Sequence, residues 1–561
     1  MSDHSMSDIT KKPDISGSPE MPEAHDIMKT RGIPETHDIM QSRGIPETHV
    51  MPQSRGILKT PDILLTHGYF LQEDPAEKKI MKPYPPLGIL YLSAWLKQKG
   101  FNVDVYDSTF SSFESFRNHV DERRPKAVGL YCNLMTRPVI LRMIDYLKQG
   151  GTDIIVGGPE TSHHYHGFIE AGAHYIVCGE GEETLAELLG FLESRETAKT
   201  AGNDDMIHTK FTGRDVNPPH GKRAGGTTEK SHDDILSRIR GLAFRDSSGR
   251  IIKTEPRPTW ENLDTLPLPD REAIDLERYI STWREHHGLG AVSLMTVRGC
   301  PYSCTWCSRA VFGETYRRRS PRLVADEVEM LIERYRPDML WFADDVFTIN
   351  HRWFFELRDE FQRRNIKIPF ECTSRADRLN EKVVKALADM GCFRVWYGSE
   401  SGSQRILDAM ERGVTVEKVQ EVTELTRKYG IESGWFVMFG YEGEDIPDID
   451  ATLEHLKKSN PDSYLTTIAY PIKGTPYYYD VEKHIHTRGS WHDRTERDVM
   501  LDNRPSRLFY TFVQAWIANE MRLHRHQTAS AMRRIPWFLK AKTARFGMKM
   551  TGRGKYAKNG N

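Results

Sequence analysis

Three cysteines, Cys300, Cys304 and Cys307, stand close together in the segment VRGCPYSCTWCSRAVFG. Their thiolates could bind metal from one short loop. A tetrahedral structural zinc site would need a fourth thiolate or imidazole at regular spacing, and the nearest following histidine is His351. Three thiolates instead suit a 4Fe-4S cluster that leaves one iron open to a bidentate ligand. The alternatives are a structural zinc site and a cysteine-rich loop without metal.

The cysteines directly follow the first strand of a series in which strands alternate with helices. Helical periodicity is expected between the strands, as in residues 321–336, 381–391 and 416–430. Six strand and helix pairs predict an incomplete parallel barrel, whose site lies at the carboxyl ends of the strands. The expected strands are residues 291–299, 339–347, 368–377, 393–401, 432–440 and 463–472.

An earlier series of short apolar strands and amphipathic helices precedes the barrel. Such strict alternation is typical of a parallel sheet covered on both faces. Five strands in about 130 residues predict a flavodoxin-like domain. The expected strands are residues 62–70, 102–108, 127–132, 152–160 and 174–182.

The chain of 561 residues is long enough for two or three domains, and we expect an α/β protein with a mainly helical carboxyl-terminal region. A twelve-residue repeat opens the chain and carries too few apolar side chains to fold. The predicted organisation is a disordered repeat leader at 1–60, the flavodoxin-like domain at 61–194, a linker or insertion with a hairpin at 195–285, the barrel at 286–480 and a helical basic region at 481–561.

Charge and cysteine content limit the functional classes. The 78 Lys and Arg residues nearly balance the 79 Asp and Glu residues, so the whole chain gives no argument for nucleic acid binding. Seven cysteines at low density indicate reduced thiols, and the chain start has no export signal, so we expect a cytoplasmic protein. The four cysteines outside the cluster are expected to be small core side chains: Cys132, Cys178, Cys372 and Cys392.

The cysteine segment resembles the radical S-adenosylmethionine (SAM) superfamily, whose motif is Cys-x3-Cys-x-aromatic-Cys, with Trp306 at the aromatic place. The segments YGSESGSQRIL at 397–407, CTSRAD at 372–377 and FADDVF at 342–347 resemble strand ends of that family that face SAM. The resemblance therefore implies a SAM-binding enzyme with a 4Fe-4S cluster on the three cysteines. The residues that it places beside SAM are Ser399, Glu400, Ser374, Arg375, Ala343 and Asp344.

Residues 61–194 resemble the cobalamin-binding domain that precedes the barrel in one large class of radical SAM enzymes. The resemblance rests on PYPPLGILYLSAWL at 83–96 and on two glycine-rich strand ends, IIVGGPET and IVCGEGEET. No Asp-x-His-x-x-Gly motif occurs, so no protein imidazole is expected below cobalt; His163, His164 and His166 are expected to be exposed at the start of a helix. The implied corrin contacts are Gly157, Gly158, Pro159, Thr161, Gly179, Glu180 and Gly181, with Asn133 and Thr136 as weaker candidates.

Together these resemblances imply an enzyme that uses SAM and cobalamin to methylate an unactivated carbon of a small or lipid-like substrate. One alternative is ring formation or oxygen addition, as in the anaerobic cyclase of chlorophyll synthesis. Another is a cobalamin-binding sensor or carrier with a structural cluster. The sequence identifies neither the substrate nor a general base.

The radical chemistry implies an external low-potential electron donor such as flavodoxin or ferredoxin. The final 41 residues hold eleven Lys or Arg residues and no Asp or Glu. Their mixture of cations and aromatic side chains could contact an anionic membrane surface, or could serve as a solubilising tail in which Pro536 and the glycines break any long helix. Membrane-spanning segments are not expected.

Overall fold

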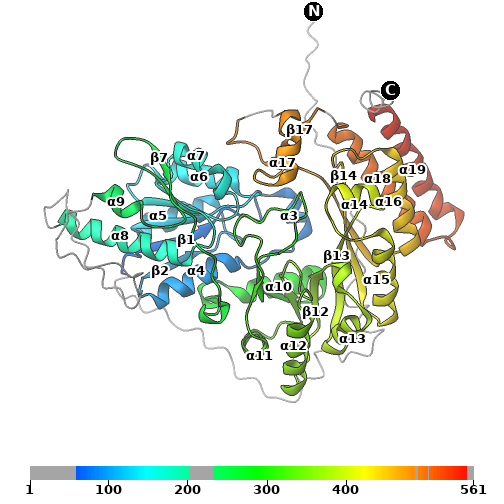
Figure 1. Cartoon of the computed structure of the whole chain (residues 1–561), viewed down its shortest axis with the longest axis horizontal. Coiled ribbons are helices and arrows are strands. Elements are labelled where there is room, and N and C mark those ends of the chain that lie inside the picture. The colour runs from blue at the N-terminus through cyan, green and yellow to red at the C-terminus, as the bar shows by residue number, and fades with distance from the viewer. Residues whose placement is uncertain (1–58, 201–230, 487–489, 503, 553–561) are drawn as a thin grey trace, which may run out of the picture.

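The computed structural model describes residues 59–200, 231–486, 490–502 and 504–552. The predicted repeat leader lies almost wholly outside these residues. Figure 1 shows two bodies side by side, with the blue and cyan elements in one and the yellow to red elements in the other.

The first body is built on a seven-stranded sheet in the order β2-β1-β3-β4-β5-β6-β7. The first five strands pair in parallel, in the order of a flavodoxin-like domain, which confirms the predicted fold. They are β1 (Ile63–His67), β2 (Val103–Tyr106), β3 (Ala127–Tyr131), β4 (Asp153–Gly157) and β5 (Tyr175–Val177). The helices between and after them are α3 (Pro75–Ile80), α4 (Leu87–Gln98), α5 (Phe113–Arg123), α6 (Arg137–Leu147), α7 (Thr161–Ala171) and α8 (Glu182–Thr200).

Both faces of this sheet are buried because its strands are apolar at successive positions. Ile63 and Leu65 of β1 belong to a cluster with side chains of α4 and α8. Leu64, between them, belongs to the cluster on the opposite face, with side chains of α5 and α6. The strand period of two therefore distributes one continuous apolar run between two cores.

A hairpin extends the same sheet. The strands β6 (Leu242–Arg245) and β7 (Ile251–Lys253) follow the short helix α9 (His232–Leu236), and β6 pairs antiparallel with β5. Asp246 closes the turn, because its Oδ1 accepts hydrogen bonds from the amides of Ser248 and Arg250. The expected hairpin is present, and it belongs to the first sheet. Helix α10 (Leu276–His287) then leads into the barrel.

The second body holds a six-stranded parallel sheet in the order β15-β14-β13-β12-β11-β8, which confirms the predicted partial barrel. The strands are β8 (Ala291–Leu294), β11 (Met339–Phe342), β12 (Phe370–Ser374), β13 (Cys392–Glu400), β14 (Glu432–Phe439) and β15 (Ser463–Ile468). A small ribbon of β9 (Val297–Arg298) and β10 (Arg317–Arg318) flanks the cysteine loop. The helices are α11 (Pro321–Tyr335), α12 (His351–Arg363), α13 (Glu381–Met390), α14 (Gln404–Ala409), α15 (Val416–Lys428) and α16 (Ile446–Ser459).

Alternation along the barrel strands separates core side chains from those that line the interior. Leu340 and Phe342 of β11 pack in the main apolar cluster, whereas Trp341 between them does not belong to it. On the inner side the buried Arg394 donates hydrogen bonds to Glu371 at 2.8 Å and to Glu432 at 2.6 Å. Cys372 and Cys392 are buried in the main cluster, Cys132 is buried in the first body and Cys178 is half-buried.

The carboxyl-terminal region is mainly helical, as expected. After α17 (Pro476–Val481) and the small ribbon of β16 (Ile485–His486) and β17 (Met500–Leu501), the long helices α18 (Arg507–Arg525) and α19 (Ala531–Gly552) pack against each other. The expectation that Pro536 breaks the last helix is wrong. Pro536 removes only one backbone donor near the beginning of α19, and burial of Ala541, Ala544 and Met548 stabilises the rest. No helix among the described residues is long and apolar enough to cross a bilayer.

Candidate functional site

The cysteine loop lies between β9 and β10 and is fixed to the barrel by Thr305. The Thr305 amide donates a hydrogen bond to the Met410 carbonyl at 3.2 Å, and the Thr305 hydroxyl lies 2.6 Å from the Tyr441 hydroxyl. Trp306 packs beside the same small cluster, which contains Met410 and Tyr441. Its aromatic ring therefore helps to anchor the loop.

The three cysteines are all free thiols, at different depths. Cys304 is buried, Cys300 is half-buried and Cys307 is exposed. Surrounding protein raises the pKa of Cys300 and of Cys307, although part of the Cys307 surface reaches solvent, and the neighbouring cysteines and Asp345 add to the effect. The three sulfurs are thus electrostatic neighbours, as ligands of one cluster must be.

The side chains around Cys304 fit a negatively charged cluster. Arg375 Nη1 lies 3.6 Å from Cys304 Sγ, and Arg412 Nη1 lies 4.0 Å from it. Guanidinium groups at these distances would stabilise a thiolate and the cluster bound to it. Within the described ranges, no three Cys, His, Asp or Glu side chains are placed so that they could hold a single metal ion. A cubane does not require this, because each thiolate binds a different iron.

The carboxyl end of β13 carries Ser399 and Glu400, both buried. Glu400 has a left-handed backbone with φ of 55°, at an irregularity in the pairing with β14. Its carboxylate folds back over Gly398, where any side chain would overlap it. Burial raises the pKa of Glu400, and Arg412, whose Nε lies 3.6 Å from Glu400 Oε1, opposes that shift.

His455 of α16 supports Ser399 from behind. Its Nε2 lies 3.1 Å from Ser399 Oγ, and its Nδ1 lies 3.1 Å from Gln420 Nε2. The ring stacks on Trp435 with 4.6 Å between centroids. Burial lowers the pKa of His455 to about 4, so the ring is neutral near pH 7.

At the end of β12, the adjacent residues Ser374 and Arg375 have different neighbours. Ser374 Oγ forms a buried hydrogen bond of 2.6 Å with Thr348 Oγ1. The Arg375 guanidinium lies over the Tyr302 ring at 3.6 Å and donates to the Arg412 carbonyl at 2.7 Å. Arg375 thus joins the cysteine loop to the β13 side of the site, whereas Ser374 holds two strand ends together.

Asp344, expected beside SAM, lies at the end of β11 and is bound to the loop after β8. Its buried carboxylate accepts hydrogen bonds from the Thr296 amide at 2.7 Å, the Val297 amide at 3.1 Å and the Thr296 hydroxyl. Burial raises its pKa to about 6. Asp344 therefore fixes the loop after β8. The adjacent Asp345 is exposed, has no hydrogen bond to any described residue, and lies near enough to Cys300 and Cys307 for its charge to raise their pKa.

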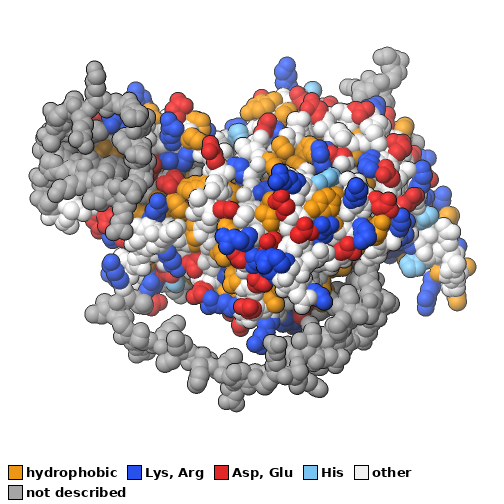
Figure 2. Space-filling view, turned by 60° about the horizontal axis from the view of Figure 1, so that its bottom comes forward, with side chains coloured by type: hydrophobic (Ala, Val, Ile, Leu, Met, Phe, Trp, Pro, Cys, Tyr) orange, Lys and Arg blue, Asp and Glu red, His pale blue; other side chains and the backbone are white. Residues whose placement is uncertain are grey.

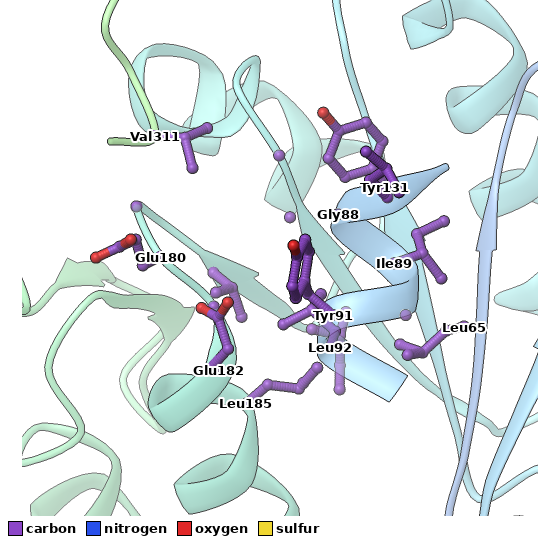
Figure 3. A pocket seen from close by; sticks show the side chains of 18 of the residues that line it. Leu65, Gly88, Ile89, Tyr91, Leu92, Tyr131, Glu180, Glu182, Leu185 and Val311 are labelled. Carbon is purple, nitrogen blue, oxygen red and sulfur yellow. The ribbon is translucent and has the colours of Figure 1, made fainter. Parts of the chain in front are cut away.

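An apolar pocket lies at the carboxyl ends of the strands of the first sheet (Figure 3). Leu65 and Ile89 lie on one side of it, and Glu180 and Glu182 lie on the opposite side. Met295, Val311 and Phe312 of the second body complete the wall. Gly157, Gly158, Gly179 and Gly181, all expected to contact a corrin, line this pocket.

Gly158 shows why glycine is needed at this edge. Its φ is 105°, and a Cβ would overlap the carbonyl oxygen of Cys132. Gly179 also has a positive φ, of 83°. The backbone at these positions can therefore lie directly against a flat ligand. The apolar lining and the bare glycine backbone fit a corrinoid, and the lining contains no histidine.

Several sequence candidates lie outside this lining. Pro159 and Thr161 do not line the pocket, and the buried Thr161 hydroxyl donates to the carbonyls of Gly158 and Val177. Asn133 likewise accepts hydrogen bonds from the amide of Thr136 and from its neighbour Met135, which shapes the turn before α6. These side chains build the strand ends.

Glu180 lines the pocket, but its carboxylate binds the second body. It pairs with Arg298 at 3.0 Å and with Arg317 at 2.8 Å, and it accepts a hydrogen bond from the Trp260 amide. All three partners of Glu180 are beyond residue 250. Glu180 therefore holds the two bodies together at the wall of the pocket.

The expectation that the three helix-start histidines are exposed is wrong for two of them. His166 is exposed, whereas His163 and His164 are half-buried. His163 packs against Gly474, and the His164 ring lies 5.9 Å from that of Trp491. The segment around α17 covers this face of α7, as Figure 1 shows at the top between the two bodies.

Two family models match these two bodies. The model of the B12 binding domain matches residues 78–189, and that of the radical SAM superfamily matches residues 294–456. The architecture is thus a B12-binding domain followed by a radical SAM domain. The protein is a cobalamin-binding radical SAM enzyme, whose cofactors are SAM, a 4Fe-4S cluster and cobalamin.

Curated relatives share this organisation at low identity. An uncharacterised methyltransferase, PH0819, of Pyrococcus horikoshii is 26% identical over 74% of this chain and 83% of its own length. Cytidylyl-2-hydroxyethylphosphonate methyltransferase of Streptomyces wedmorensis is 27% identical over 70% of this chain and 76% of its own. Anaerobic magnesium-protoporphyrin IX monomethyl ester cyclase of Rubrivivax gelatinosus is 25% identical over 68% of this chain and 63% of its own.

Solved structures show the same fold. The radical SAM methyltransferase TsrM from Kitasatospora setae, with cobalamin and a [4Fe-4S] cluster bound, aligns with a TM-score of 0.57 at 19% identity, over 75% of this chain and 74% of its own. The cobalamin-dependent radical enzyme OxsB, with aqua-cobalamin and SAM bound, aligns with a TM-score of 0.61 at 16% identity, over 88% of this chain and 72% of its own.

Proposed function

We propose that the protein methylates an unactivated carbon of a small or lipid-like substrate. The observation that carries the proposal is that the segment with the cysteine loop also forms part of the wall of the corrin pocket. Val311 and Phe312 line the pocket, and they follow Cys307 by four and five residues on the same segment. One loop therefore borders both cofactor sites, as a reaction that uses both requires.

The residues of the chain would hold the three cofactors in this arrangement. Cys300, Cys304 and Cys307 would bind the cluster, with Arg375 near Cys304. Ser399, Glu400 and Asp345 would bind and orient SAM. When bound, the cluster and SAM supply one-electron cleavage of the sulfonium, and cobalamin supplies a carrier for the methyl group. The apolar walls between the two bodies exclude water from that chemistry.

Two relatives with methyltransferase names support methylation over other outcomes. Hopanoid C-3 methylase of Methylococcus capsulatus, 24% identical over 63% of this chain, adds an enzyme named for a lipid substrate. Three relatives named as anaerobic cyclases support the second candidate, oxidative ring formation on a tetrapyrrole. The two candidates differ in the mass of the product.

The test uses the full chain, reconstituted anaerobically with iron, sulfide and cobalamin. Extracts of cells lacking the protein supply the substrate, and SAM carries a trideuterated methyl group. Methylation predicts an extract component that gains this labelled group. A product that loses hydrogen or gains oxygen without deuterium would support the cyclase instead. Reduced flavodoxin or ferredoxin supplies electrons in the assay, in the role that a low-potential donor would have in the cell.

A further inference from the structure

A second cavity adjoins the corrin pocket and reaches into the barrel. It has a volume of about 420 Å³ and shares four lining residues with the corrin pocket: Leu87, Gly88, Ile89 and Tyr131. Ser293 of β8, Trp341 of β11 and Ala343 line its other side. A molecule in this cavity would contact both bodies and would lie directly beside the corrin pocket.

Aromatic side chains form much of its wall. The rings of Tyr84 and Trp341 lie 6.4 Å apart at 45°, and both residues line the cavity. Tyr84 borders the cavity, and 47% of its surface is exposed. The surrounding protein nevertheless raises the pKa of its hydroxyl. Trp283 fixes the loop that carries Tyr84: its Nε1 donates to the Pro83 carbonyl at 2.7 Å, and its ring contacts Tyr84 edge-on at 5.3 Å.

Three residues that line the cavity carry hydroxyl groups with no hydrogen-bond partner in the described part of the chain. Ser293 is 4% exposed, and its Oγ has no hydrogen-bond partner among the described residues. The hydroxyls of Tyr84 and Tyr131 also form no hydrogen bond within the described ranges. A buried polar atom without a partner costs free energy unless a ligand or water satisfies it. The Ser293 oxygen is itself enclosed by protein, so the hydroxyls of Tyr84 and Tyr131 are the ones that a polar atom of a ligand can reach.

No charged side chain lines this cavity. A carboxylate, phosphate or ammonium group placed in it would lose its hydration without gaining an opposite charge. Apolar and aromatic walls with a few hydroxyl groups instead match a neutral ligand whose orientation is fixed by one or two hydrogen bonds.

We propose that this cavity holds the methyl-accepting part of the substrate, and that this part is uncharged, flat and largely apolar, with one hydroxyl or keto oxygen beside the hydroxyl of Tyr84 or Tyr131. The inference rests on the proposed function, since it places the acceptor carbon between the corrin pocket and the barrel. Charged groups of the substrate, where it has any, lie outside the cavity.

The test measures binding of three probes to the reconstituted, cobalamin-loaded protein by anaerobic calorimetry: 2-naphthol, naphthalene and 2-naphthoate. We expect 2-naphthol to bind at least about tenfold more tightly than 2-naphthoate. The double variant Tyr84→Phe/Tyr131→Phe should weaken 2-naphthol binding about fivefold and leave naphthalene binding unchanged. Trp341→Ala should weaken both neutral probes about tenfold, whereas the control Trp537→Ala, on the outer helix α19, should weaken neither.

Equal binding of 2-naphthoate and 2-naphthol would overturn the proposal, as would unchanged probe binding in Trp341→Ala. Loss of 2-naphthol binding when cobalamin is loaded would also overturn it, because the cavity would then belong to the corrin. This binding test is independent of methyl transfer. Protein that binds the probes as expected but forms no methylated product in the labelled-SAM assay would therefore refute the proposed function alone.

The outer helix α19 carries an independent inference. One face of α19 packs inward through Ala541, Ala544 and Met548. The opposite face exposes large apolar side chains, and in Figure 1 α19 lies at the outer edge of the second body. These exposed residues are Met532 (82%), Ile535, Leu539, Phe546 (63%) and Met550, spaced at three, four, seven and four residues so that they form one stripe.

The charges around this stripe are of one sign. No Asp or Glu occurs after residue 520, and basic side chains flank the stripe, including Lys540, Lys542 and Lys549. Figure 2 shows blue basic side chains beside orange apolar ones at the right-hand edge, where the turn between α18 and α19 lies. Two copies of such a face would repel each other, whereas an anionic lipid surface would attract it.

We infer that α19 docks on an anionic membrane surface, with the apolar stripe among the lipid tails and the lysines at the headgroups. The test is flotation of the full chain with vesicles of phosphatidylcholine, with or without phosphatidylglycerol. We expect binding to the anionic vesicles only, weakened by salt and reduced about tenfold or more in Leu539→Asp/Phe546→Asp. The control Leu508→Asp, an exposed leucine on α18, should bind as the parent does.

Failure to bind anionic vesicles would overturn this inference, as would equal flotation of the Leu539→Asp/Phe546→Asp variant. A dimer in the parent chain that dissociates in this variant would assign the stripe to a second copy instead.

Discussion

The Nε2 atom of His455 lies 3.1 Å from the hydroxyl of Ser399, and this contact fixes the direction of that hydroxyl. The Gln420 amide lies against Nδ1 and can only donate to it through its nitrogen, so Nε2 carries the proton of the neutral ring. Nε2 therefore donates to Ser399 Oγ. The Ser399 proton is left to point to a ligand, and His455 acts as a positioning residue.

We expect His455→Phe to weaken SAM binding about three- to tenfold, because the substitution keeps the stack on Trp435 and removes the hydrogen bonds to Ser399 and Gln420. Ser399→Ala should have a similar effect, and the double variant should be little weaker than either single variant. Anaerobic calorimetry on the reconstituted protein measures these affinities. Additive losses would show that His455 does not act through Ser399.

Cys304→Ala should lose the cluster, because Cys304 is the most buried of the three thiols and the one beside Arg375. Iron and sulfide analysis after reconstitution should fall from about four of each per chain to background. Cys392→Ala is the matched control, since Cys392 is a buried core side chain of β13. Cluster content that survives in Cys304→Ala would remove this cysteine from the ligand set.

Arg375→Gln should make the reduction potential of the cluster more negative, because a positive charge 3.6 Å from Cys304 stabilises the reduced form. The expected change is about 50 mV, given that about 1.4 kcal/mol corresponds to 59 mV for one electron. Arg375→Lys should keep most of the parent potential. A redox titration followed by electron paramagnetic resonance makes the comparison, and an unchanged potential in Arg375→Gln would contradict the account.

Gly157→Val should prevent cobalamin binding. Gly157 lines the corrin pocket, has an ordinary backbone conformation and has room for a Cβ, which would lie 3.7 Å from Val177. The variant should fold, and its larger side chain should occupy the space of the ligand. Bound cobalamin after gel filtration, read from absorbance, should fall about tenfold or more. Gly190→Ala on α8, with open space around it, should bind cobalamin as the parent does.

Stability should depend on pH through Glu444. Burial raises its pKa from 4.5 to about 8, and its Oε2 accepts the Gly440 amide proton. The folded chain then binds a proton that the unfolded chain releases above pH 4.5, so this group stabilises the fold fully below pH 4.5 and loses that effect as the pH rises through 8. Glu444→Gln should flatten the fall of the melting temperature between pH 5 and 8. An identical pH profile in the variant would contradict this assignment.

Local patterns in the sequence predicted the fold and the cluster loop. The apolar runs around Leu64 and Trp341 predicted strands, because neighbouring side chains of a strand point to opposite faces of its sheet. The close spacing of the three cysteines was enough to place them on one loop. The contacts that the sequence did not reveal are those between side chains that are distant in sequence. Glu180 pairs with Arg298 and Arg317 across the two bodies, which no local pattern reveals.

The sequence also does not show which of two adjacent acidic residues at a strand end faces the site. Asp344 and Asp345 are neighbours, yet one is buried against Thr296 and the other acts on the cysteines, depending on how the chain turns after β11. His455 and Arg412 were missed because their functional neighbours, Ser399 and Cys304, come from other elements. The cysteine motif itself gives no indication of His455 or Arg412.

The most direct test of the account is to prepare the full chain anaerobically with iron and sulfide and to record its Mössbauer spectrum with and without SAM. We predict a 4Fe-4S cluster in which one iron of four changes its signal when SAM is added, and no such change in Cys304→Ala. A protein that takes up a single zinc and no iron would contradict the central claim.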